Sequence, residues 1–360
     1  MVRNRKVFKK TVSIVNEKST DMYESLVGDK KGFLLESYDK NYDRYTFFGM
    51  EPEEIVTSRG NALVITKADG TEEVREGNPL ERLKEYYSEF HIEKEDEELS
   101  FSGGLVGNLG YDFVRYSEVL PDNNPDEIGI ETIQMMLMTS FLMVDHVAET
   151  LTAVVLEEPS EEGREQAMEK AGQMIKKAME KKECRRNFYH DGKIIKKSDS
   201  IEEYGEKVEK IKHYIREGHV FQTVLSQRWT IETRQTGFEL YKELRELNPS
   251  PYLYYFNYGT FEVIGSSPEM IVKKQGNKVF TCPIAGTRKR GKDEAEDKRL
   301  RDELLSDEKE RAEHVMLVDL ARNDMGRISE FGTVKVTQFM EVQNYSHVMH
   351  IVSMVEGKKK

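Results

Sequence analysis

The chain has 360 residues, of which 38% are hydrophobic and 33% are charged, and its formal net charge is −12. This length exceeds what one small hydrophobic core serves, so we expect two or three domains, or one large domain built from two sheets. An acidic chain has no general attraction for phosphate backbones, and no apolar run reaches the roughly 18 residues of a membrane span, which argues against nucleic-acid and membrane partners.

The first 195 residues combine strand-like runs with two helical segments, separated by Gly, Asn and Asp turn signals. Two runs, 135–146 and 150–158, are apolar on both faces, which indicates buried strands. Segment 159–183 is rich in Glu and Lys and predicts an exposed amphipathic helix. The remaining elements expected here are strands at 31–37, 44–50 and 61–67 and a helix at 79–90.

A change of composition near Ser198 begins the second part of the chain. The elements expected there are a helix at 200–217, a strand at 220–232, a helix at 237–247, three strands through residue 283, helices at 293–305 and 307–322, and strands at 332–342 and 345–354. Adjacent strands interrupted by helix pairs predict an α+β fold of two packed antiparallel sheets flanked by helices. We expect residues 1–195 to form a regulatory region and residues 198–360 to carry the functional site.

Cysteine usage and the N-terminus indicate the compartment. Cys184 and Cys282 lie far apart without a CxxC pattern, which excludes a disulfide framework and a cysteine-based zinc site. The basic N-terminus leads into no apolar segment, so it is not a secretory signal. These features predict a cytoplasmic protein.

The segment HVFQTVLSQRW predicts a strand with one polar face. With a period of two, Gln222, Ser226 and Arg228 share a side, opposite Phe221 and Leu225. An amide, a hydroxyl and a guanidinium in one row are suited to polar recognition. A half-solvated strand with no such role explains the pattern equally well.

Glu269 follows a Gly-Ser-Ser-Pro turn and precedes an apolar run that predicts a strand. A carboxyl beside apolar neighbours is partly desolvated, which favours the protonated form that a general acid needs. A glutamate of a surface turn is the alternative.

The segment PIAGTRKRG places a glycine and a basic turn at a strand end. Gly286 lets the backbone approach a ligand closely, and the N–H groups near Thr287 are suited to a carboxylate or an enolpyruvyl oxygen. Arg288, Lys289 and Arg290 are either a substrate clamp or a solvated basic turn.

The helix predicted at 307–322 carries a carboxylate on an apolar segment. Glu313 shares a face with Leu317 and Leu320, and a carboxylate that faces inward needs a partner because an isolated buried charge is too costly. Mg²⁺ is one such partner, since it binds one or two carboxylates together with substrate oxygens. An ion pair with Arg311 or Arg322 is the alternative.

The last predicted strand carries two histidines. His347 and His350 are an odd number of residues apart, so they point to opposite faces and do not form a metal pair. Only one of them can face a site, and a core histidine is the alternative for either.

Six segments in this order resemble the chorismate-utilising enzymes, and among these the anthranilate synthase component I group matches best. The resemblance is strong over 198–360 and extends to LLES at 34–37 and RYTFFG at 44–49. The segments are FQTVLSQR, NPSPYLYYF, GSSPEM, PIAGTRKRG, DEKERAEHVMLVDLARNDMGRIS and YSHVMHIV.

The resemblance implies a reaction and a role for each candidate residue. Chorismate and ammonia, delivered by a glutamine amidotransferase subunit (component II), give anthranilate and pyruvate with Mg²⁺ as cofactor, so a hetero-oligomer is expected. Glu313 corresponds to a magnesium ligand, and Gly286 and Thr287 to substrate contacts. Glu269 corresponds to the general acid that helps the 4-hydroxyl to leave. His350 corresponds to the histidine tied to pyruvate elimination and aromatisation.

Two positions distinguish this chain from relatives with other reactions. Relatives that add water carry a lysine base where this chain has Gln222, and an amide is no base near neutral pH. Aminodeoxychorismate synthases commonly carry a nucleophilic lysine where this chain has Ala285. The resemblance therefore implies anthranilate formation. Aminodeoxychorismate synthase component I and a catalytically silent tryptophan-binding fragment remain the alternatives.

LLES and the NPSPYL turn resemble the allosteric site at which tryptophan inhibits. On this resemblance Ser37, with Glu36 nearby, lies in a pocket with Pro251, Tyr252 and Leu253. The family pattern continues past EGKKK with further substrate- and metal-binding segments. We accordingly expect a fold that is truncated at the C-terminus and a chain with reduced Mg²⁺ affinity.

Overall fold

The computed structural model describes residues 2–15, 17–37, 44–93, 99, 101–180, 191–345 and 347–360. Cys184 and the end of the helix predicted at 159–183 lie outside them. The chain divides into two compact units, which are described separately: Met1–Lys182 with Tyr241–Lys360, and Glu183–Leu240. In the described residues, no helix is long and apolar enough to cross a membrane.

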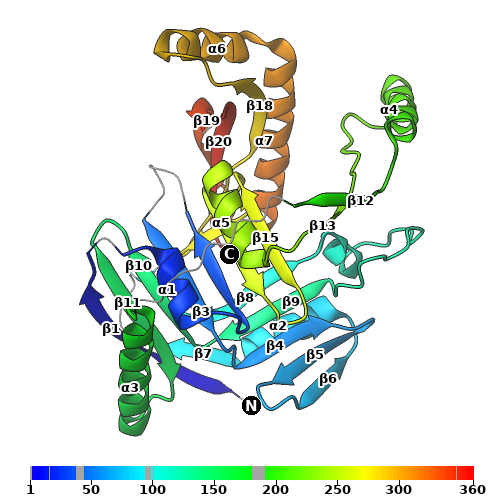
Figure 1. Cartoon of the computed structure of the whole chain (residues 1–360). Coiled ribbons are helices and arrows are strands. Elements are labelled where there is room, and N and C mark those ends of the chain that lie inside the picture. Colours follow the sequence, from blue (N-terminus) through cyan, green and yellow to red (C-terminus); the bar gives the residue numbers. More distant parts are fainter. Residues whose placement is uncertain are drawn as a thin grey trace. The chain divides into compact units, whose positions relative to one another are not determined.

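An eight-stranded sheet is the largest in the first unit (Figure 1). All of its pairs are antiparallel except β1 with β7. Its strands, in sheet order, are β15 Glu262–Ser267, β14 Tyr252–Asn257, β2 Gly32–Glu36, β3 Tyr45–Met50, β10 Ser140–Asp145, β11 Thr150–Glu157, β1 Arg3–Ser13 and β7 Phe90–Glu93. Alternating apolar side chains such as Phe33, Phe141 and Val154 fill its core.

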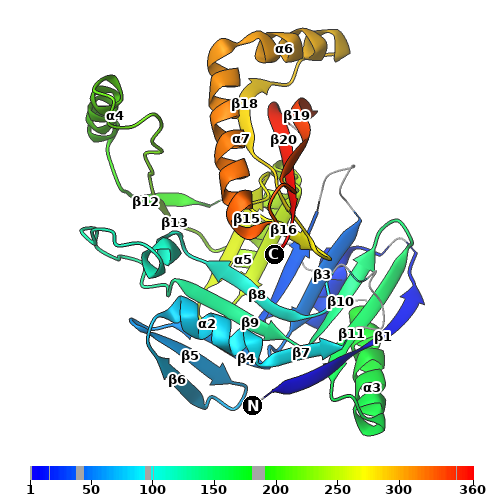
Figure 2. The ribbon, with the colours of Figure 1, turned by 180° about the vertical axis from the view of Figure 1, so that it is seen from behind.

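Two helices cover one face of this sheet. Helix α3, Glu161–Ala178, packs on β11 and β1, and helix α1, Ser19–Leu26, packs on α3 and β3. Small residues of α3, among them Ala167 and Ala171, are buried and allow close approach to the strands. Figure 2 shows α3 from behind, lying against β11 and β1. The helix predicted from Glu and Lys content is therefore amphipathic, with a solvated face and a buried one.

A five-stranded antiparallel sheet forms the second core. Its strands, in sheet order, are β6 Glu72–Glu76, β5 Ala62–Lys67, β4 Glu54–Ser58, β9 Ile133–Met138 and β8 Gly104–Leu109. Helix α2, Pro79–Ser88, packs on β5 and β6, and a short 3-10 helix spans Tyr111–Tyr116. The single strand predicted at 135–146 is wrong, because the chain passes at Thr139 from β9 into β10 of the other sheet.

A third sheet of the first unit carries the predicted chemistry. Its strands are β16 Lys273–Gln275, β17 Lys278–Thr281, β18 Ile284–Lys289, β19 Lys335–Asn344 and β20 Val348–Lys358. The order is β16-β17-β20-β18, and β19 also pairs with β20. Helices α6, Glu294–Ser306, and α7, Glu308–Ile328, pack against β18 and β20. Helix α5, Gly237–Leu247, precedes β14 and ends in this unit.

The second unit holds helix α4, Ile201–Arg216, and a hairpin-like pair of β12, Lys193–Lys197, with β13, Trp229–Glu232. Ser200 and Glu203 start α4 with a reciprocal capping box. The strand predicted at 220–232 is wrong over most of its length. Within 220–232, only the residues of β13 pair with another strand among the described residues. A strand needs a partner for its backbone groups, and the residues before β13, which pair with no described strand, are irregular.

The α+β class predicted from the sequence is confirmed. The strands of the described residues divide among four sheets, and helices flank three of them. Both helices predicted between residues 293 and 322 are present, and α7 extends further, to Ile328.

Candidate active site

Three of the predicted site residues meet where β18 pairs with β20. Thr287 lies opposite His350, and the register shifts between Ala285 and Thr287, so Gly286 lies in a bulge. His350 Nδ1 is 3.0 Å from both the Gly286 carbonyl oxygen and Thr287 Oγ1. A carbonyl only accepts, so Nδ1 carries the proton and donates to both oxygens. In the neutral form of the ring, Nε2 is then the atom that carries the lone pair.

Gly286 occupies a position that a side chain would obstruct. Its φ is +72°, and a Cβ atom there would lie 3.0 Å from Ile351 Cδ1 and 3.3 Å from Glu310 Oε2. The absent side chain thus lets the α7 carboxylate lie against the β18 backbone. Glu310 was not predicted as a site residue. No sequence signal singled it out, because its place four residues before His314 matters only once the structure shows that His314 is fully buried.

The inward face of α7 differs from the predicted one. His314, Val318, Ala321 and Met325 form the buried stripe, whereas Leu320 is 57% exposed. Glu313 and Leu317 are half-buried beside this stripe, so the predicted inward face is wrong at Leu320 and holds only in part for Glu313. Apolar residues surround this helix, so their spacing did not single out the face that packs on β17 and β20.

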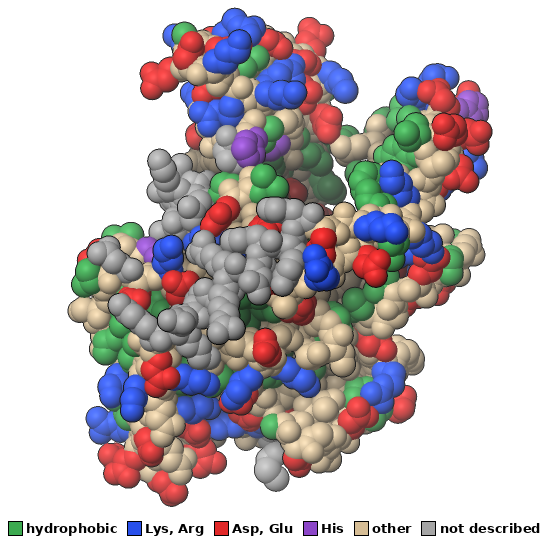
Figure 3. Space-filling model, viewed as in Figure 1, with side chains coloured by type: hydrophobic (Ala, Val, Ile, Leu, Met, Phe, Trp, Pro, Cys, Tyr) green, Lys and Arg blue, Asp and Glu red, His purple; other side chains and the backbone are tan. Residues whose placement is uncertain are grey.

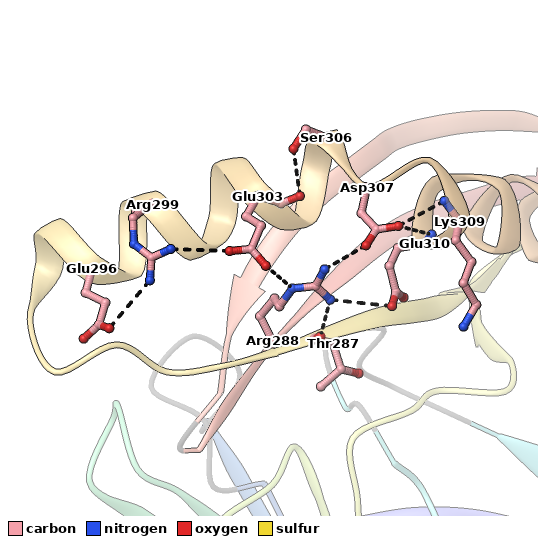
Figure 4. Close-up of polar contacts among 9 residues, drawn as sticks. All are labelled: Thr287, Arg288, Glu296, Arg299, Glu303, Ser306, Asp307, Lys309 and Glu310. Atoms are coloured by element: carbon pink, nitrogen blue, oxygen red, sulfur yellow. Dashed lines mark hydrogen bonds and ion pairs between the residues drawn. The ribbon is translucent and has the colours of Figure 1, made fainter.

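Both arginines of the basic turn after Gly286 are paired with carboxylates, and Figure 4 shows the contacts of Arg288. Arg288 contacts Glu303, Asp307 and Glu310, and Arg290 pairs with Asp297 at 2.6 Å. Hydrogen bonds to the carboxylates raise the pKa of Arg288 above its ordinary value. Over α6, cationic and anionic side chains intermingle on the surface (Figure 3). This arrangement favours structural ion pairs over a substrate clamp.

Glu269 lies close to the start of β18. Burial and the negative charge of Glu269 raise the pKa of the Cys282 thiol to about 11, and Cys282 lies two residues before the strand. Glu269 itself is exposed, and its role as general acid stays a prediction. The prediction of an apolar strand directly after Glu269 is wrong, because Ile271 and Val272 are exposed and β16 begins only at Lys273.

Two further candidates lie elsewhere. Gln222 belongs to the second compact unit and is exposed in the irregular segment before β13. His347 lies just before β20, and its Nε2 donates to the Leu247 carbonyl at 3.1 Å, whereas His350 contacts Gly286 and Thr287.

The residues of the predicted tryptophan pocket lie on neighbouring strands. Strand β2 pairs with β14, with Glu36 opposite Leu253, so Ser37 lies beside the segment Pro251–Leu253. Ser37 Oγ is buried and has no hydrogen-bond partner among the residues that the structure describes. Pro251 and Leu253 are buried, whereas Tyr252 is half-exposed.

Glu36 anchors this corner. Its carboxylate is buried and accepts hydrogen bonds from Tyr241 at 2.6 Å, from Arg245 at 2.8 Å and from Ser19 at 2.5 Å. A buried carboxylate is tolerated when such partners satisfy it. The end of β2 is thereby fixed to α5.

A magnesium ion fits the carboxylates of α7 in part. Within the described residues no group of three His, Cys, Asp or Glu side chains is arranged to hold a metal. Mg²⁺ usually takes one or two protein carboxylates and completes its shell with water and substrate oxygens. Glu313 and Glu310, one turn apart on α7, provide such a partial set.

The comparisons with known proteins identify the family of the chain. A family model described as chorismate binding enzyme matches residues 32–360, and the chain belongs to this family. Within it, the chain is similar to anthranilate synthase component 1 of Acetivibrio thermocellus, with 41% identity over 91% of this chain and 68% of that protein. The corresponding protein of Aquifex aeolicus (strain VF5) is also 41% identical, over 90% of this chain and 67% of the relative.

A solved structure supports the same placement. The crystal structure of anthranilate synthase component I from Streptococcus pneumoniae TIGR4 superimposes with a TM-score of 0.75 and 34% identity. The match covers 88% of this chain and 69% of that chain. The chain thus spans about two thirds of the length of these relatives.

Proposed function

We propose that this chain acts as the chorismate-converting component of an anthranilate synthase. It would form anthranilate and pyruvate from chorismate and ammonia. The observation that carries the proposal is the convergence of Gly286, Thr287 and His350 at one bulge, in a chain 41% identical to proteins named anthranilate synthase component 1.

The geometry suits a proton-transfer site. Because His350 donates through Nδ1 to Gly286 and Thr287, its orientation is fixed and Nε2 can accept a proton from a substrate ring. The N–H groups of the bulge and the Thr287 hydroxyl would orient the substrate oxygens. Glu269 would protonate the departing 4-hydroxyl, since hydroxide is a poor leaving group, and Gln222, which is no base, would leave ammonia as the nucleophile.

The remaining assignments belong to the same proposal. Glu313, with Glu310 beside it, would hold Mg²⁺, which when bound supplies positive charge to the substrate carboxylate. A second component, a glutamine amidotransferase, would supply the ammonia, as the name component 1 of the relatives suggests. Ser37 and Pro251–Leu253 would bind tryptophan as an inhibitor. A cytoplasmic location, favoured by the two dispersed cysteines, completes the proposal.

Incubation with chorismate, Mg²⁺ and ammonium at alkaline pH tests the activity. We expect anthranilate, detected by its fluorescence and mass, together with an equal amount of pyruvate. His350→Asn should lower the rate by about 10²-fold or more, the usual range for a positioned acid or base. The matched control, His347→Asn, should retain the wild-type rate. Aminodeoxychorismate as product, or binding without turnover, would contradict the proposal.

A further inference from the structure

Arg288 connects the Gly286 bulge to a helix end. It directly follows Thr287 in β18, its side chain is 21% exposed, and its Nη1 donates to the Thr287 carbonyl at 3.0 Å. One edge of the guanidinium is therefore committed to the backbone of its own strand. This contact fixes the direction in which the side chain leaves β18.

The same guanidinium binds the junction of α6 and α7 (Figure 4). Nη2 donates to Asp307 Oδ2 at 2.8 Å, and Nε donates to Glu303 Oε1 at 3.1 Å. Asp307 is the N-cap of α7, since its carboxylate also accepts from the backbone N–H groups of Lys309 and Glu310. Arg288 thereby holds the first turn of α7.

Charge explains why this position requires a cation. The carboxylates of Glu303, Asp307 and Glu310 all lie within 3.6 Å of Arg288 nitrogen atoms. Without the guanidinium, like charges would repel one another and the helix end would move away from Gly286. A planar guanidinium can donate to several carboxylates at once, whereas a lysine ammonium is a single point charge.

We propose that Arg288 is a positioning residue that sets the distance between the Gly286–Thr287 bulge and the α7 carboxylates. It does not bind the substrate itself, because Thr287 and the helix junction engage its donors. Glu310 lies against Gly286, and Glu313 follows one turn later on α7. This inference rests on the proposed function, in which the bulge binds chorismate.

Chorismate binding to the whole chain, measured by calorimetry with Mg²⁺ present, tests the role. Arg288→Lys should weaken binding at least tenfold. Asp307→Asn should weaken it to a similar extent, although asparagine also caps helices well and keeps the first turn intact. Amide hydrogen exchange should accelerate in β18 in both variants, and in Arg288→Lys it should accelerate in the first turn of α7 as well.

Arg299 provides the control. It pairs with Glu296 and Glu303 in the same surface network but does not contact β18 or α7 through these ion pairs. Arg299→Lys should leave both chorismate affinity and exchange in β18 unchanged.

The outcomes separate the possible failures. If Arg288 clamped chorismate directly, Asp307→Asn would release the guanidinium and leave binding unchanged or tighter, which would overturn the positioning role. Equal loss in the Arg299 variant would also overturn it. If the wild-type chain bound no chorismate, the proposed function would fail, and with it this role.

Discussion

Gly286 combines two constraints that only glycine meets. Its φ of +72° lies in the left-handed region, and the space that a Cβ would occupy is bordered by Ile351 and Glu310. The first constraint is conformational and applies to any left-handed residue. The second is specific to this bulge, because the neighbouring atoms belong to the strand and helix that frame the proposed site.

Gly286→Ala should show the effect of both the left-handed backbone and the close contacts of the added Cβ. We expect a loss of about 1–2 kcal/mol in stability from backbone strain and, in addition, a drop in chorismate affinity of tenfold or more. Gly276→Ala is a matched control, since Gly276 has a φ of +59° and no atom within 4 Å of its added Cβ. It should lose similar stability and keep its affinity. Equal affinity in the two variants would contradict a role for the close contact.

At the scale of elements, His314 joins α7 to two strands. Ser353 Oγ of β20 accepts the Met340 N–H of β19 at 3.0 Å and lies 2.6 Å from His314 Nε2. A serine oxygen that accepts from Met340 can still donate its own proton to an unprotonated Nε2, the arrangement that suits a neutral His314 ring. Met340 has a φ of +54°, so the same serine also supports an unfavourable backbone conformation in β19.

This link predicts a pH dependence of stability. Burial lowers the pKa of His314 below its ordinary value, whereas the unfolded imidazole titrates near 6.5. Below about pH 6.5 the unfolded chain binds a proton that the folded chain excludes. The stability contributed by neutral His314 is thus present above that pH and declines as the pH falls, by at most about 1.4 kcal/mol per unit.

Denaturant unfolding of wild type and His314→Gln between pH 5 and 8 measures this effect. Glutamine can still accept the Ser353 proton through its amide oxygen but does not titrate. The free-energy difference between the two proteins should be constant from pH 7 to 8 and should shrink toward pH 5. A difference that stays constant across the whole range would show that His314 does not contribute the pH dependence.

The helices and strands were predictable from local sequence patterns, whereas the contacts between these elements were less predictable. The helix predicted at 237–247 matches α5, because its apolar spacing is helical and clear. The inward face of α7 was not predictable, since Val315, Leu317 and Leu320 surround it with apolar side chains. Contacts with β17 and β20 select the buried face, and a local pattern contains no information on them. For the same reason Glu310 was missed.

At the scale of the whole molecule, distant segments meet through sheet order. The family resemblance implied a common site for Ser37 and Pro251–Leu253, and the pairing of β2 with β14 brings these segments together. Local periodicity could not show this pairing. It equally could not show that the apolar run 135–146 is divided between two sheets at Thr139, because both halves are buried and strand-like.

The tryptophan site proposed at the pair β2–β14 predicts that tryptophan stabilises the chain. A ligand that binds only the folded state adds about 2.7 kcal/mol at a hundredfold excess over its Kd, so thermal unfolding should shift upward by several degrees. Ser37→Ala should reduce the shift, because the buried Ser37 hydroxyl, which has no partner in the described residues, would no longer meet the ligand. Ser88→Ala, at the exposed end of α2, should respond like wild type.

Phenylalanine at the same concentration separates a specific pocket from general amino-acid binding. It should produce little shift, since it lacks the indole N–H and fills less volume. An equal shift with phenylalanine, or an undiminished shift in Ser37→Ala, would place tryptophan elsewhere. A shift that depends on Ser37 would tie tryptophan binding to the strand pair β2–β14. The chorismate assay would then show whether the Gly286 bulge acts independently of the tryptophan site.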